Sequence, residues 1–299
     1  MNLRDLFFVS QWDVAYREIG AETCFDLLSK KKRSIFKQIK DTKKYSFADP
    51  LFFSDENGNY LFVEAINKKS RKGTLGVFDF NNGLGKFHHL IEEVFHMSYP
   101  FVFKHQGEYF LMPESNNAHQ LLLYRATEYP YKWEKYKVLL DGVDCVDTTI
   151  YRGEGNNETY LLTYVKSKPY NMMSVYKLNE DLTLTKIKDI VDEKQSQRGA
   201  GHFITIGEKW YRPSQYCADT YGHYLLFNQV ESGCPDYQEK ESFQVRPGAV
   251  RIMEVSKRLV YKIHTYSRGE NYEFIDFMHR RFSPLKPLKK IIQKIKSRI

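Results

Sequence analysis

Short apolar runs alternate with polar turns along most of this chain, and residues 98–115 show the unit clearly. Two apolar runs, 99–103 and 109–112, lie on either side of Gly107, and Glu114 follows the second run. Apolar runs of about four to six residues are typical of buried strands, and glycine permits the tight reversal between them. The stretch therefore predicts a β-hairpin with a carboxylate just past its second strand.

The hairpin pattern recurs along the chain, with copies that start at residues 49, 99, 147, 200 and about 262. This spacing of roughly 50 residues is typical of propeller blades with four strands each. The sequence therefore predicts an all-β fold, a five-bladed β-propeller over residues 1–283. We expect residues 4–19 to add a strand to the last blade, and residues 22–44 to form a polar excursion. Blade four is expected over residues 198–229, and the fifth copy, 262–276, is the least regular.

Residues 284–299 form a basic tail. They hold six basic residues and no acidic one, whereas the whole chain has a net charge of +8, so the body is near +2 and does not indicate a nucleic-acid-binding protein. Apolar residues repeat in the tail at helical spacing, which predicts a short amphipathic helix. Such a helix can lie on an anionic membrane surface. A helix that caps the propeller and a disordered tail are the alternatives.

Other features bear on location. Residues 1–9 carry charges among their apolar positions, so no secretion signal is expected, and no apolar run approaches the roughly 18 residues that span a bilayer. The four cysteines show no short paired spacing, which favours free thiols in a reducing compartment over a zinc site. We therefore expect a cytoplasmic protein, peripheral at the inner face of the membrane if the tail binds there.

Acidic residues recur at equivalent places in the repeats. The first strand of each propeller blade lines a central channel, so the residues that open these strands converge at one end of it. Asp49 and Asp147 open repeats one and three, and Glu114 ends the second strand of repeat two. We predict that these three form a catalytic cluster, because glycosidic-bond chemistry uses one protonated and one ionised carboxyl group. The alternative is that aspartate before a strand serves only turn chemistry.

Further side chains are predicted to bind substrate. Amide, imidazole and guanidinium donors suit sugar hydroxyls or a phosphate, and the fourth copy offers Arg198, His202, Arg212 and Gln215. Glu64 and Tyr99 are added because their places in the repeat match those of Glu114 and Asp49, and His264 is added from the fifth copy. The aromatic content of 15% suits a sugar-binding surface, although strands alone also explain it.

An ordered set of motifs over residues 45–277 resembles a known family. The strings are ADPLFF at 48–53, HMSYPFVF at 96–103, MPES at 112–115, LYRA at 123–126, YRPSQ at 211–215 and YG at 221–222. Together they resemble the N-terminal domain of plant glucosamine inositolphosphorylceramide transferases and its stand-alone bacterial relatives. That domain is related to the five-bladed propellers of family-43 glycoside hydrolases.

The resemblance implies a furanosidase-type propeller in which Asp49 matches the aspartate that serves as base in the hydrolases. Glu114 and Asp147 match positions typical of the domain, but their order along the chain differs from the Asp, Asp, Glu order of the hydrolases. Related propellers also imply a divalent cation at the channel centre, although no dedicated ligand loop is visible, and no other cofactor is expected. In the plant proteins, transferase chemistry is attributed to a separate C-terminal domain, which this chain is expected to lack.

Two functions follow as hypotheses. The first is an enzyme that acts on a glycosidic bond, by transfer or hydrolysis, in cell-surface polysaccharide or glycolipid metabolism. Its substrate would be a sugar or glycan, either nucleotide-activated or lipid-linked. The second is a non-catalytic module that recognises a glycan and positions it for a partner glycosyltransferase.

Overall fold

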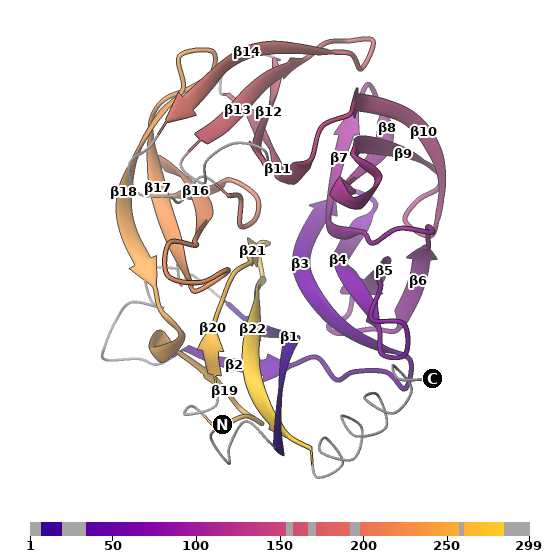
Figure 1. Cartoon of the computed structure of the whole chain (residues 1–299), viewed down its shortest axis with the longest axis vertical. Coiled ribbons are helices and arrows are strands. Elements are labelled where there is room, and N and C mark those ends of the chain that lie inside the picture. The colour runs from indigo at the N-terminus through magenta and orange to yellow at the C-terminus, as the bar shows by residue number, and fades with distance from the viewer. Residues whose placement is uncertain are drawn as a thin grey trace, which may run out of the picture.

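The computed structural model describes residues 7–19, 34–153, 158–166, 172–191, 198–256 and 260–283. Its strands form five sheets that surround a central axis (Figure 1). The predicted five-bladed β-propeller is thereby confirmed. The expected amphipathic helix at 284–299 lies outside the described residues, and no described helix is long and apolar enough to cross a membrane.

Blades one to four each contain four antiparallel strands that follow one another in the sequence. Blade one is β3 (Tyr45–Asp55), β4 (Gly58–Asn67), β5 (Gly73–Asp79) and β6 (Phe87–Ile91). Blade two is β7 (Ser98–His105), β8 (Glu108–Glu114), β9 (Gln120–Glu128) and β10 (Lys132–Asp141), with the 3₁₀ helix η2 (Asn116–Ala118) after β8. Blade three is β11 (Cys145–Arg152), β12 (Thr159–Val165), β13 (Met172–Leu178) and β14 (Leu184–Val191). Blade four is β15 (Ile204–Ile206), β16 (Lys209–Tyr216), β17 (Tyr224–Ser232) and β18 (Gln238–Val245).

Blade five joins the two ends of the described chain. Its strands are β1 (Phe8–Glu18), β2 (Ser34–Gln38), β19 (Val250–Ile252), β20 (Val260–Lys262), β21 (Tyr266–Arg268) and β22 (Tyr272–Phe282), with the 3₁₀ helix η3 (Pro247–Ala249) before β19. The order across the sheet is β19-β2-β1-β22-β20, and β21 also pairs with β22. β1 pairs with β22 along its whole length, from Phe8 opposite Phe282 to Glu18 opposite Tyr272. The prediction that an N-terminal strand completes the last blade is confirmed.

Two sequence-based expectations about the strands were wrong. Residues 34–38, expected in a polar excursion, form β2, which pairs with β1 and places Phe36 in the core with no exposed surface. Blade four extends beyond residue 229, because β18 adds an outer strand whose exposed residues alternate with less exposed ones. Both strands lie near the outer edges of their sheets, where few apolar residues mark them in the sequence.

Buried aromatic side chains fill the spaces between neighbouring blades. Phe52 of blade one stacks on Phe274 of blade five, with ring centroids 4.9 Å apart. Between blades three and four, the rings of Tyr151 and Trp210 lie 5.8 Å apart. Close packing of this kind fixes the blades relative to one another. It therefore also fixes the side chains that each blade presents at the axis.

Strand direction gives the propeller two distinct ends. β3, β7 and β11 begin at one end of the axis, which we call the entry end, and β4, β8 and β12 return to it. The links between blades, such as residues 92–97 from β6 to β7, lie at the entry end as well. The turns within the first hairpins, such as residues 105–108, lie at the opposite, far end.

Candidate functional site

The first strands of blades one, two and three share one backbone irregularity. Residues 49 and 50 of β3 lie between the pairs Ala48–Glu64 and Leu51–Phe62, where β4 has a single residue, so β3 carries a β-bulge. β7 and β11 have the same extra residue at the equivalent place. The residues at these bulges are Asp49, Tyr99 and Asp147, and each has a φ of 47°. Bulges re-aim side chains, and here the same bulge occurs at the same place in three neighbouring blades.

Asp49 is only 6% exposed and is held from two other blades. The backbone N–H of Tyr99 donates to Asp49 Oδ2 at 3.2 Å, and the Thr265 hydroxyl donates to Oδ1 at 3.0 Å. Burial raises the pKa of Asp49 to about 7, although the opposing charge of His264 lowers it. Glu64 and other carboxylates nearby raise it further. Asp49 can therefore take up or release a proton near neutral pH.

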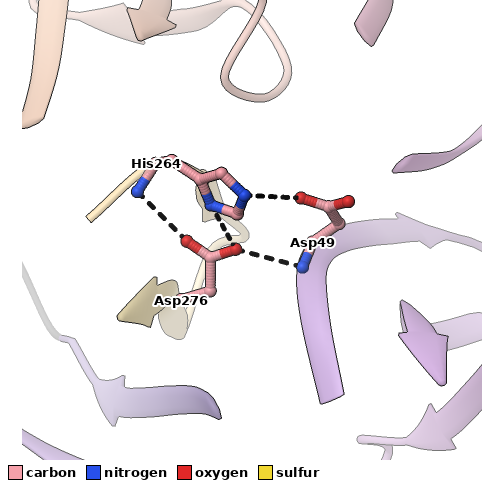
Figure 2. Close-up of side chains that lie close together, drawn as sticks. All are labelled: Asp49, His264 and Asp276. Carbon is pink, nitrogen blue, oxygen red and sulfur yellow. Dashed lines mark hydrogen bonds and ion pairs between the residues drawn. The ribbon is translucent and has the colours of Figure 1, made fainter. Parts of the chain in front are cut away.

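His264 and Asp276 lie beside Asp49, as Figure 2 shows. His264 Nδ1 lies 2.6 Å from Asp276 Oδ2, and His264 Nε2 lies 3.6 Å from Asp49 Oδ1. Burial disfavours the imidazolium, but the charges of Asp276 and Asp49 outweigh it and raise the pKa of His264. The backbone N–H of Asp49 donates to Asp276 Oδ2 at 3.1 Å, which ties blade five to blade one.

Glu114 and Asp147 form a second group around Arg198. The Arg198 guanidinium lies 3.4 Å from Glu114 Oε2 and also donates to Asp147 Oδ2. Gln215 Nε2 donates to the same Asp147 oxygen at 2.8 Å, and the Asp147 N–H donates to Glu114 Oε2 at 3.3 Å. Burial and the charge of Asp147 raise the pKa of Glu114 well above its usual range, and Arg198 partly offsets this. The structure thus brings together the predicted residues Glu114, Asp147, Arg198 and Gln215.

Aromatic side chains border both groups. The Trp12 ring stacks on His264 at 3.9 Å, and the Tyr221 ring meets His264 edge-on at 5.4 Å. The Arg198 guanidinium lies 4.7 Å from the centre of the Tyr221 ring, and Tyr221 is 42% exposed. An aromatic border beside carboxylates and an arginine is suited to the apolar faces and the hydroxyls of a sugar ring.

Tyr99 and His202 fill the axis beneath the acids. The Tyr99 side chain has no exposed surface, and its hydroxyl accepts the Gly201 N–H at 2.7 Å from blade four. His202 of blade four lies 4.2 Å from the ring of Phe101 in blade two, and burial lowers the pKa of His202 to about 4. The prediction that Tyr99 contacts substrate needs correction, because its ring is buried in the core. Its hydroxyl lies between Thr149 of blade three, at 3.0 Å, and Gly201 of blade four, so Tyr99 packs where these blades meet.

Two other predicted residues have partners of their own. His96 Nε2 donates to Glu64 Oε1 at 3.0 Å, and this hydrogen bond raises the pKa of His96. Arg212 is buried and forms an ion pair with Glu239 of β18, within blade four. This contact stabilises the blade, and the assignment of Arg212 to substrate binding stays a prediction.

Asp49, His264 and Asp276 could also hold a metal ion, because their ligand atoms all lie within 4.8 Å of one another. Two carboxylates and an imidazole are a suitable donor set for a divalent transition metal, whereas calcium prefers oxygen ligands alone. The Nδ1 atom of His264 is already occupied by its contact with Asp276. A cation would therefore have to use His264 Nε2 or displace this contact.

Sequence reasoning missed four residues of the site: Trp12, Tyr221, Thr265 and Asp276. Asp276 ends the second hairpin strand of the fifth repeat, so its position in the repeat could have indicated it. Trp12 lies in β1, which belongs to no hairpin repeat, and no sequence pattern connects it to the axis.

Comparison with known proteins identifies the family to which this chain belongs. The family described as "Glucosamine inositolphosphorylceramide transferase 1, N-terminal" matches residues 37–247. Glucosamine inositolphosphorylceramide transferase 1 of Oryza sativa subsp. japonica is 27% identical over 227 residues, which cover 70% of this chain and 29% of that protein. The protein of the same name from Arabidopsis thaliana is 29% identical over 203 residues, covering 62% of this chain and 25% of that protein. The chain thus spans less than a third of the length of these relatives.

Solved structures of glycoside-processing proteins share the fold. The RS223 β-xylosidase superposes with a TM-score of 0.57 at 10% identity, covering 81% of this chain and 94% of that one. An α-L-arabinofuranosidase from Podospora anserina gives a TM-score of 0.57 at 10% identity, covering 82% of this chain and 94% of that one. At such low identity, these similarities concern the fold alone. With the match over residues 37–247, the chain belongs to the family of the N-terminal domain of glucosamine inositolphosphorylceramide transferase 1.

Proposed function

We propose that this chain acts on a glycosidic bond in cell-surface polysaccharide or glycolipid metabolism, at the entry end of the propeller. The observation that carries the proposal is that the buried Glu114 and Asp147 share the cation of Arg198, while Asp49, from a third strand, lies close enough to interact with both through its charge. Chemistry at a glycosidic bond needs a proton donor and a negative charge close together. The names of the relatives and of the structural neighbours, which refer to glycosyl transfer and glycoside cleavage, support a sugar substrate.

The environments of the acids suggest separate roles. The pKa values of Asp49 and Glu114 are both raised, so either group can hold a proton near neutral pH and transfer it to or from an oxygen. Asp147 pairs with Arg198 and supplies a negative charge that would stabilise an oxocarbenium-like centre. Trp12 and Tyr221 would contact the sugar ring and exclude water.

A substrate screen tests this proposal. The purified full chain is incubated with UDP-glucosamine, UDP-N-acetylglucosamine and a panel of p-nitrophenyl glycosides, and product is measured. We expect turnover by the wild type and its loss in Asp49→Asn and Glu114→Gln, while Glu208→Gln, in an exposed far-end turn, stays fully active. If both site variants fold normally and keep full activity, the catalytic assignment is wrong.

A non-catalytic glycan-recognition module is the second candidate. It is favoured by Arg198, which engages both Glu114 and Asp147 in ion pairs and so occupies two of the three acids. On this reading, the wild type would bind a glycan without turning it over, and Asp49→Asn would bind it as well as the wild type does. Titration calorimetry measures the binding of the same compounds to the wild type and to Asp49→Asn, and so separates binding from turnover.

A further inference from the structure

Three loops of blade one lie side by side at the entry end: residues 40–44, 68–72 and 92–97. The Lys68 N–H donates to the Lys44 carbonyl at 2.9 Å, and Lys68 Nζ donates to the Thr42 carbonyl at 2.7 Å. The third loop is held to the second, because the Gly73 N–H donates to His96 Nδ1 at 2.9 Å. These contacts make the three loops one continuous surface, which we call the blade-one rim.

The rim carries an excess of positive charge. Two of its lysines are neutralised, Lys68 by Asp41 at 2.9 Å and Lys72 by Glu92 at 3.2 Å. Within the described part of the chain, the remaining exposed cations of the first two loops form no ion pair with a carboxylate; they are Lys40, Lys43, Lys69 and Arg71, together with Lys44, which lies over the ring of Tyr45. Unpaired cations gathered on one surface attract an extended anionic partner.

The third loop adds an apolar side chain to the rim. Val94 is 93% exposed and lies between the neutralised Lys72 loop and His96 in the same surface. An isolated exposed valine is unremarkable, but a protruding apolar residue among unpaired cations matches the composition of surfaces that bind anionic lipid. A nucleic acid or a free anion would gain nothing from Val94, which favours a lipid surface.

The far end lacks a comparable cluster of unpaired cations. Lys104 pairs there with Asp55 and Glu56, and Lys132 pairs with Glu128, while Glu180 and Asp181 add negative charge in a further turn. An anionic surface would therefore be attracted more strongly to the rim than to the far end. The described chain ends at the entry end, where β22 finishes at Phe282.

The rim adjoins the candidate site. His96 of the third loop lies 3.0 Å from Glu64, and the charge of Glu64 acts on Asp49. A surface bound at the rim would thus lie close to Asp49.

We propose that the blade-one rim docks the propeller on an anionic lipid surface, with the entry end facing the headgroups. The docking itself is independent of any reaction. Its consequence for the substrate rests on the proposed function: a sugar carried by a lipid in that surface would reach Asp49 directly.

Vesicle binding by the full chain tests the docking surface. Vesicles of phosphatidylcholine with and without phosphatidylglycerol are sedimented with the wild type and with the rim variant Lys43→Gln/Lys69→Gln/Arg71→Gln. The matched control is Lys86→Gln/Lys132→Gln/Lys209→Gln, which removes the same charge from far-end turns. We expect the wild type to prefer anionic vesicles and the rim variant to bind them roughly a hundredfold more weakly, at about fivefold per charge. The control should retain binding close to that of the wild type, and added salt should weaken the wild type most.

Further variants separate the rim from other sources of binding. Val94→Ser should weaken vesicle binding in a way that salt does not alter. A variant with its six tail cations replaced by glutamine should still lose affinity when the rim changes are added. The proposal is overturned if rim and control variants lose affinity equally, if the tail alone accounts for binding, or if the rim binds inorganic pyrophosphate but not vesicles. Turnover of a soluble p-nitrophenyl glycoside should be the same in the rim variant and the wild type, so failure of docking and failure of the proposed function are distinguishable.

Discussion

Asp49 and Asp147 occupy the same β-bulge in blades one and three, and both have a φ of 47°. Tyr99 occupies the equivalent place in blade two with the same φ. Such a φ is unfavourable for residues other than glycine, by about 1–2 kcal/mol. The same bulge therefore carries different side chains in the three blades: carboxylates of the candidate site in blades one and three, and a buried tyrosine in blade two.

Close contact between blades at the axis predicts a large effect of Gly201→Ala. Gly201 has a φ of 139°, and a Cβ added there would lie 1.9 Å from the Tyr266 carbonyl oxygen of blade five. We expect this variant to lose more than about 3 kcal/mol of unfolding free energy, or to fail to fold. Gly107→Ala has a φ of 84° but open space around it, and should cost about 1 kcal/mol. Urea denaturation of both variants measures this, and equal losses would contradict the packing described.

The raised pKa of Asp49 predicts that stability falls with rising pH. The folded protein holds this proton up to a pKa of about 7, whereas the unfolded chain releases it near its ordinary 3.8. The contribution of Asp49 to the free energy of unfolding is therefore complete below about pH 4 and is lost as the pH rises to about 7. His264, whose pKa is raised, adds a loss in the same direction as the pH passes through its folded value.

Asp49→Asn removes the first of these contributions. We expect this variant to gain stability relative to the wild type between pH 5 and pH 8, as measured by urea denaturation at the two values. A difference in unfolding free energy that does not change with pH would show that Asp49 titrates in its ordinary range.

Arg198→Gln should destabilise the protein because it leaves Glu114 and Asp147 buried together without a cation. Removing one partner of a buried ion pair costs about 3–5 kcal/mol. The loss should shrink at low pH, where Glu114 takes up a proton and the repulsion disappears. Thermal unfolding at pH 5 and pH 8 measures the difference, with Arg71→Gln as the control at an exposed position. A loss that is the same at both pH values would argue against a shared cation.

Trp12 should report on ligand binding. Its ring stacks on His264 at 3.9 Å, whereas Trp133 and Trp210 pack between strands away from His264. A sugar bound beside His264 should therefore change the intrinsic fluorescence of the wild type, and Trp12→Phe should abolish most of that change. A ligand-dependent signal that persists in Trp12→Phe would place the ligand elsewhere.

Much of the architecture could be predicted because the blades repeat. The hairpins around Gly107 and Gly207 show apolar runs and turn chemistry in each copy, so four blades were recognisable from local sequence. β2 and β18 were not. β18 follows its partner β17 directly but is mostly exposed, so its sequence shows no apolar run, whereas β2 pairs with β1 and with the distant β19. The equivalence of Asp49 and Asp147 was likewise readable from the repeat.

The composition of the site was harder to predict, because most of it depends on contacts between blades. Nothing near Trp12 in the sequence indicates that β1 closes the ring beside His264. Tyr99 shows the converse: its position in the repeat was correctly assigned, but the bulge directs its ring into the core and not toward a substrate. The repeat predicts the backbone position of a residue, whereas packing between blades determines which atoms its side chain contacts.

A crystal structure of Asp49→Asn with a sugar identified in the substrate screen tests the central claim most directly. We expect a sugar ring at the candidate site, with an oxygen within about 2.6–3.2 Å of residue 49 or of Glu114 and one ring face against Trp12 or Tyr221. A sugar bound only at the far end or on the outer strands would contradict the proposed function.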